Sequence, residues 1–217
     1  MRHIYLIPGL AASPGIFDFF EMPSDQFVVH NLTWELPLPQ ESLQAYCLRF
    51  KELITHENPI LIGVSYGGIV AQELATMISV ENIVIISSVK SINEFPRRIR
   101  YAKRFQLQKA LPTFLVEHIE WLFKYNFGIG QKKLERYERY LHVRDKKYLD
   151  WAFNCIVNWK RKKPDPRVIH VHGEVDAVFP MRYISRCHVI PGASHAAIIT
   201  HAKWINEHLP DLLRANT

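Results

Sequence analysis

A serine between two glycines is the first residue in this sequence whose setting points to chemistry. Ser65 lies in Gly63-Val64-Ser65-Tyr66-Gly67, which matches the pattern G-x-S-x-G. The apolar run before it predicts a strand, and helix-forming residues follow it. A sharp turn from strand to helix exposes the serine hydroxyl, and small neighbours permit that turn. Ser65 is therefore the candidate nucleophile, and the alternative is a glycine-rich turn that only packs tightly.

A serine hydroxyl needs a base to take its proton and an acid to orient that base. In the chain order expected after this kind of turn, the acid follows the serine and the histidine comes last. Asp176 follows one predicted strand, and His195 follows the next predicted strand. Because the carboxyl ends of parallel strands meet at one edge of a sheet, we predict that Ser65, Asp176 and His195 converge there.

Neighbouring polar residues offer competing assignments. Glu174 also lies beyond a strand end and is the rival acid. His170 and His172 share one strand face, so with Glu174 and Asp176 they could hold a metal ion. Buried strand histidines bonded to neighbours are the more common case, and Asp176 has a better role. The remaining candidates are interpreted as structural, with Ser88 also able to line a pocket: Ser13, Ser88, Ser194 and His201.

Alternating apolar runs and helical periods must position these residues. Six segments have the pattern of strands: His3–Ile7, Phe27–Leu32, Pro59–Val64, Asn82–Ile86, Arg167–His172 and Cys187–Ile190. Helical spacing marks a first helix at Leu43, Tyr46, Cys47, Phe50, Leu53 and Ile54, a second at Val70, Leu74, Met77 and Ile78, and a third over Ala196–Leu209. This alternation predicts an α/β fold with a mostly parallel sheet of about six strands flanked by helices.

The middle of the chain differs in composition from the rest. Residues 90–163 hold 19 Lys and Arg against 7 Asp and Glu, and 14 of the 26 aromatic residues. We therefore predict a core of residues 1–89 and 164–217 with residues 90–163 inserted as a helical cap. Four helices are expected in the cap: Pro96–Lys109, Pro112–Lys124, Gln131–Leu141 and Asp145–Lys160.

Three segments together resemble the α/β-hydrolase superfamily, in particular its small serine hydrolases with a helical cap. They are the serine motif Gly63–Gly67, the acid loop Gly173–Pro180 and the histidine loop Gly192–His195. Pro8-Gly9-Leu10 corresponds to the glycine turn of the family, with Pro8 where many members have histidine. The resemblance implies an oxyanion hole built from the backbone N–H groups of Leu10 and Tyr66, with no cofactor and no metal.

By the same resemblance, the expected activity is hydrolysis of an ester or thioester through an acyl-enzyme. The alternative within enzymes is a carbon–carbon bond hydrolase or lyase that uses the same triad. The alternative from another class is a non-catalytic binding protein that keeps the fold.

Composition limits compartment and partners. The 217 residues are 48% hydrophobic and 22% charged, which excludes a disordered or collagen-like chain. No run is long enough for a signal peptide or a membrane span, and three scattered cysteines fit reduced thiols, so a cytoplasmic location is expected. Lys160–Lys163 is interpreted as a solvated charge run rather than a nucleic-acid site. A small acyl substrate is expected, with an acidic leaving group suggested by the basic cap; the sequence leaves the oligomeric state open.

Overall fold

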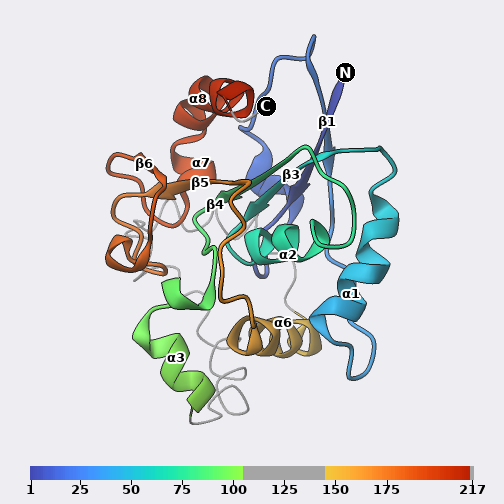
Figure 1. Cartoon of the computed structure of the whole chain (residues 1–217), viewed down its shortest axis with the longest axis vertical. Coiled ribbons are helices and arrows are strands. Elements are labelled where there is room, and N and C mark those ends of the chain that lie inside the picture. The colour runs from blue at the N-terminus through green and yellow to red at the C-terminus, as the bar shows by residue number, and fades with distance from the viewer. Residues whose placement is uncertain (105–144, 216–217) are drawn as a thin grey trace.

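The computed structural model describes residues 1–104 and 145–215, and its centre is one six-stranded parallel sheet (Figure 1). The strand order is β2-β1-β3-β4-β5-β6. The strands are Arg2–Ile7 (β1), Phe27–Asn31 (β2), Ile60–Val64 (β3), Asn82–Ile86 (β4), Val168–Gly173 (β5) and His188–Ile190 (β6). All five neighbouring pairs run parallel. The predicted α/β fold is confirmed, and no strand boundary differs from its prediction by more than one residue.

Helices cover both faces of this sheet because alternate strand residues point to opposite sides. Tyr5 and Ile7 of β1 pack in one buried cluster with α1 (Leu43–Phe50) and α2 (Tyr66–Leu74). Ile4 and Leu6 pack in a second cluster with α7 (Ala197–Thr200) and α8 (Ala202–Ala215), which lie on the other side of the strands in Figure 1. Short 3-10 turns complete the framework: Pro14–Phe17, Lys51–Leu53, Ile92–Glu94 and Met181–Tyr183. Among the described helices, none has the length and apolar character needed to cross a membrane.

The first two helices are shorter than their apolar spacing predicted. The first ends at Phe50 and continues only as a 3-10 turn, so Ile54 is extended rather than helical. The second ends at Leu74 instead of reaching Ile78. There the Thr76 hydroxyl donates to the carbonyl of Glu73 at 2.7 Å, a side-chain bond that competes with helix continuation.

The third helix was predicted as one element over Ala196–Leu209 and is two. It breaks at His201, where φ is −130°, and α8 then continues through Pro210 to Ala215. Proline inside a helix removes one backbone hydrogen bond. Burial of Leu209 and Leu213 against the sheet offsets that loss and holds the last turns in place.

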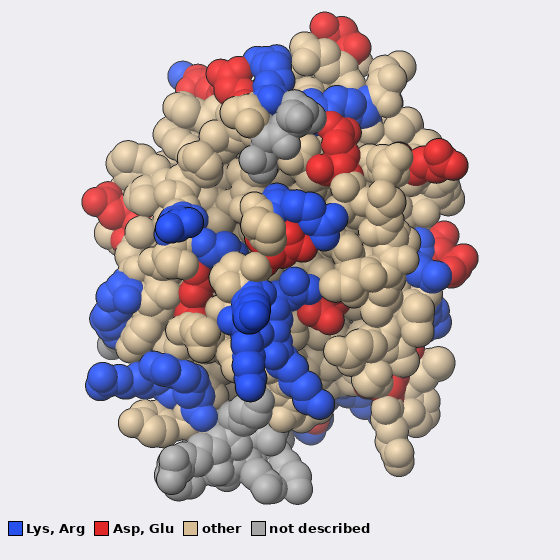
Figure 2. Space-filling model, in the orientation of Figure 1, with Lys and Arg blue, Asp and Glu red and all other residues tan. Residues whose placement is uncertain are grey.

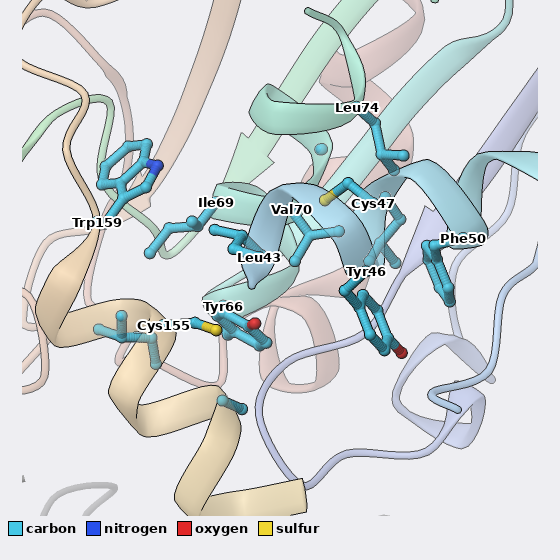
Figure 3. Packing of buried hydrophobic residues seen from close by; sticks show 14 of the residues in the cluster. Leu43, Tyr46, Cys47, Phe50, Tyr66, Ile69, Val70, Leu74, Cys155 and Trp159 are labelled. Atoms are coloured by element: carbon cyan, nitrogen blue, oxygen red, sulfur yellow. The ribbon is translucent and has the colours of Figure 1, made fainter. Parts of the chain in front are cut away.

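Two described helices lie in the connection between β4 and β5. α3 (Arg97–Arg104) and α6 (Lys146–Asn158) fall inside two of the four predicted helices, whereas the predicted helices at 112–124 and 131–141 lie outside the described residues. Figure 3 shows Cys155 of α6 against Tyr66 of α2, in the same buried cluster as α1. The division into a core of 1–89 and 164–217 and a cap of 90–163 stays a prediction.

Glycines let the turn between β3 and α2 pack directly on its neighbours. A Cβ on Gly63 would lie 2.2 Å from the carbonyl oxygen of Gly67. A Cβ on Gly67 would lie 2.3 Å from the carbonyl oxygen of Ile7, at the end of β1. Both contacts are with backbone atoms, which cannot rotate away. The start of α2 therefore touches two strands at a distance that only glycine allows.

We expect Gly67→Ala to lower the free energy of unfolding by at least about 1 kcal/mol, although alanine is the better helix former, because overpacking against backbone forces the turn to shift. Gly9→Ala is the matched control, since its Cβ would meet its nearest atoms at 3.5 and 3.6 Å, which is ordinary contact. Urea unfolding of both variants measures the difference. Equal stability of the two variants would contradict the packing argument.

Candidate active site

Ser65 occupies a strained backbone conformation at the tip of the β3–α2 turn. Its φ of 53° and ψ of −117° lie in a region that residues other than glycine rarely adopt. Its N–H donates to the carbonyl of Ile86 at 2.9 Å, and its own carbonyl accepts from the Gly68 N–H at 3.0 Å. The Ser88 hydroxyl donates to the same carbonyl at 2.6 Å. Ser88 is thus a buried support of the Ser65 backbone.

A hydrogen-bonded chain links Ser65 to His195 and Asp176, as the sequence predicted for their positions. The Nε2 atom of His195 is 3.0 Å from the Ser65 hydroxyl oxygen. The Nδ1 atom of His195 is 2.7 Å from Oδ2 of Asp176. Since a carboxylate can only accept, the ring N–H faces Asp176 and the lone pair of Nε2 faces Ser65. This tautomer is the one that can take a proton from the serine.

Asp176 is buried and held by the acid loop itself. Its Oδ1 accepts from the backbone N–H groups of Val178 and Phe179, at 2.7 and 2.8 Å. Burial acts to raise the pKa of Asp176, but the facing His195, together with His172 and the Phe179 N–H, outweighs it and lowers the pKa below its ordinary value. The carboxyl is therefore ionised at neutral pH and its position is fixed by the backbone.

The rival acid Glu174 points elsewhere. It is exposed, and its Oε2 accepts from the backbone N–H of Gly192 at 2.8 Å. This bond joins the acid loop to the histidine loop without reaching the His195 ring. The structure therefore brings Asp176, and not Glu174, to the histidine.

The alternative metal site at His170 and His172 is not assembled. His172 donates from Nε2 to the carbonyl of Phe179 at 2.8 Å, and its Nδ1 is 3.0 Å from Nε2 of His170. Burial lowers the pKa of both histidines, so both are neutral and bonded to their neighbours. Glu174 is exposed and accepts from the Gly192 N–H instead. His172 instead supports the acid loop, and its place directly before that loop is the only signal for this role in the sequence.

The loop after β1 passes directly beside Ser65. A Cβ on Gly9 would lie 3.5 Å from the Cβ of Ser65, and Nε1–H of the buried Trp34 donates to the carbonyl of Gly9 at 2.9 Å. Tyr66 is the first residue of α2, where N–H groups have no partner within the helix. Across the described parts of the chain, the N–H groups of Leu10 and Tyr66 have no hydrogen-bond acceptor. Both donors are thus available near the serine.

An arginine from α3 holds the acid loop, a contact that no sequence motif predicts. The Nη2 atom of Arg98 donates to the carbonyls of Ala177 and Val178 at 2.8 and 2.7 Å. Next to this clamp is a cavity of about 490 Å³, lined by Pro96, Arg97, Arg98, Pro180, Arg182 and Tyr183. Figure 2 shows Lys and Arg side chains gathered on the lower part of the face in view, where Figure 1 places α3 and α6. The cavity between α3 and the end of the acid loop is therefore lined by basic side chains.

Solved structures of similar fold include three proteins of low sequence identity. A thermophilic esterase from Thermogutta terrifontis is 16% identical, with a TM-score of 0.71, and the match covers 100% of this chain and 90% of that one. MenH from S. aureus is 13% identical, with a TM-score of 0.76 and coverage of 99% and 94%. A putative non-heme bromoperoxidase, BpoC, from Mycobacterium tuberculosis is 14% identical, with a TM-score of 0.72 and coverage of 100% and 93%. At these identities the likeness concerns the fold alone.

A family model that matches most of the chain identifies the family to which the chain belongs. No curated protein matches the chain by sequence. The model of the alpha/beta hydrolase family matches residues 4–208, a range that contains most of β1, the Ser65 turn, the acid loop and the histidine loop. The fold of the neighbours agrees with this match. The chain is therefore a member of the alpha/beta hydrolase family.

Proposed function

We propose that this hydrolase cleaves an ester or thioester with Ser65 as nucleophile, His195 as base and Asp176 as orienting acid. The observation that carries the proposal is the hydrogen-bonded chain from the Ser65 hydroxyl through both ring nitrogens of His195 to Asp176. The distances of 3.0 and 2.7 Å lie within the range over which a proton transfers between such groups. A binding protein that only kept the fold would have no need for a serine, a histidine and an aspartate in one hydrogen-bonded chain.

In the proposed mechanism, Ser65 Oγ attacks the substrate carbonyl while Nε2 of His195 takes the hydroxyl proton. The Leu10 and Tyr66 N–H groups stabilise the negative oxygen of the tetrahedral intermediate. His195 then protonates the leaving group, which departs and leaves an acyl-enzyme on Ser65. Water, deprotonated by His195, attacks the acyl group in the same way and frees the serine. Asp176 stabilises the imidazolium form of His195 in both halves of the reaction.

The direct test is covalent labelling by a fluorophosphonate probe. An activated Ser65 displaces fluoride and forms a phosphonate ester, which intact-protein mass spectrometry and peptide mapping would locate at Ser65. Ser65→Ala is expected to lose labelling and to lower ester hydrolysis by several orders of magnitude, because the nucleophile is gone. Labelling that persists in Ser65→Ala would remove Ser65 from this role. No labelling of the unaltered chain would favour the binding-protein alternative.

The acid assignment is tested by a matched pair of neutral substitutions two residues apart. Asp176→Asn is expected to lower kcat on the order of 10³–10⁴-fold, because the amide no longer holds the productive histidine tautomer. Glu174→Gln is expected to change kcat by less than about 10-fold, since Glu174 contacts Gly192 and not His195. A reversed order of the two losses would show the acid assignment to be wrong. Strong labelling of Ser65 without turnover of any ester or thioester would favour the carbon–carbon bond alternative.

We propose that the arginine-lined cavity, which borders the acid loop, receives an acidic group at the leaving-group end of the substrate. Arg97, Arg98 and Arg182 all line it, and Arg182 lies on the 3-10 turn that follows the acid loop. A concentration of one charge at a cleft attracts oppositely charged substrate, and salt weakens the effect. A thioester with a phosphate-bearing leaving group, such as an acyl-CoA, has this chemistry. The alternative is that these arginines are solvated surface charges with no role in substrate binding.

We expect kcat/KM for an acyl-CoA to exceed that for a neutral thioester of the same acyl group at ~20 mM salt, and the ratio to fall at ~300 mM salt. Arg182→Gln should reduce the ratio, because it removes one charge from the cavity without touching the arginine that clamps the acid loop. Lys203→Gln is the control, since it removes one exposed charge from α8. Equal, salt-independent values for both substrates would leave the basic cavity without a role in substrate choice.

A further inference from the structure

Three histidines from distant parts of the sequence meet on one face of the sheet, at the edge formed by β2. His3 is on β1, His30 is on β2, and His56 is in the segment that leads into β3. The parallel register pairs His3 with Val28 and Tyr5 with His30, which places His3 and His30 diagonally on one face. Nδ1 of His3 is 3.0 Å from Nε2 of His30, and the ring of His56 stacks on that of His3 with centroids 3.5 Å apart. None of the three belongs to the chain that runs from Ser65 to Asp176.

We propose that His3, His30 and His56 form a binding site for a divalent transition-metal ion such as Zn²⁺. One ring nitrogen from each histidine lies within 4.8 Å of the others, which is the only such set of three His, Cys, Asp or Glu in residues 1–104 and 145–215. Imidazole nitrogen is a preferred ligand of zinc, and three such ligands leave a fourth tetrahedral position for water. All three side chains are partly exposed, so an ion from solution can reach them.

The spacing fits an ion after a modest change of the rings. Tetrahedral zinc with Zn–N bonds of about 2.05 Å holds its ligand nitrogens roughly 3.3 Å apart. The 3.0 Å between His3 and His30 is already close to that value, and the widest pair has to approach by at most roughly 1.5 Å. The rings are stacked, so each must rotate about its Cβ–Cγ bond to direct a lone pair at the ion. That torsion has a broad energy minimum in histidine, and the partly exposed rings have room for it.

The surroundings orient one of the three rings. The Tyr5 hydroxyl is 2.7 Å from Nδ1 of His56, and it accepts from the Thr55 N–H at 3.0 Å. A hydrogen bond to the second nitrogen is the usual way in which a protein holds a metal-binding histidine. Tyr5 therefore occupies Nδ1 of His56 and leaves Nε2 for the ion.

The test is titration of the full chain, without an added histidine tag, with ZnCl2 at pH 7.5 by isothermal titration calorimetry. The titration is expected to show one ion per chain. Thermal unfolding is expected to show a rise in melting temperature of about 5 °C or more when free zinc is ~100 times the dissociation constant. MgCl2 should give neither effect, because magnesium prefers oxygen ligands.

Variants separate this site from general binding at surface histidines. His56→Gln should raise the dissociation constant for zinc at least ~10-fold and abolish most of the temperature shift, and His30→Gln should do the same if His56→Gln fails to fold. His188→Gln is the matched control, because it removes one exposed histidine from β6 at the opposite edge of the sheet. The proposal would be overturned if the unaltered chain bound no zinc, or if the His56→Gln and His30→Gln variants bound zinc as tightly as the unaltered chain does.

Discussion

The backbone strain at Ser65 is the constraint on which the active-site arrangement depends. A non-glycine residue in that conformation costs on the order of 1–3 kcal/mol and persists only where its surroundings hold it. Here the Ile86 carbonyl, the Gly68 N–H and the Ser88 hydroxyl hold both ends of the residue. These partners come from β4, from the loop after it and from α2, so the turn exists only when β3 and β4 are paired and α2 is packed against one face of the sheet. The cost of the strained residue is therefore met by the assembled sheet and not by the local sequence.

The acid and histidine loops depend on a second close approach between backbone segments, at the end of β5. A Cβ on Gly173 would lie 2.4 Å from the carbonyl oxygen of Ala193, so the end of β5 touches the histidine loop. The N–H of Val175 donates to that same carbonyl at 3.0 Å, and the N–H of Glu174 donates to Ile190 at 3.1 Å. These backbone hydrogen bonds hold the acid loop and the histidine loop together. The distance between Asp176 and His195 is thus set by backbone packing, and Arg98 adds a third support from α3.

Much of this could be predicted from the sequence because the information is local or follows chain order. The glycines around Ser65 are adjacent to it, and a carboxylate and a histidine after successive parallel strands must reach the same sheet edge. The structure places Asp176 against the His195 ring and Glu174 against the Gly192 N–H, and the role of Asp176 as the catalytic acid stays a prediction. Helix ends were predicted less well, since apolar spacing at Met77 and Ile78 continues beyond the point where α2 stops. Arg98 was missed because nothing in its sequence neighbourhood shows which carbonyls it meets.

The histidine cluster shows the limit of sequence reasoning most clearly. His3, His30 and His56 have no spacing that any metal motif shares, and they meet only because β1 lies between β2 and β3. The same strand ends at the Pro8-Gly9-Leu10 loop beside Ser65, so the cluster and the candidate active site share one element. Coupling between two sites requires an element with two arrangements that both sites bias. β1 is hydrogen-bonded along its length to a strand on each side, in a single register. An ion bound at the histidines would therefore join β1, β2 and the segment before β3 and add to the stability of the sheet, while the geometry at Ser65 stays set by the packing of α2 against β1 and β3.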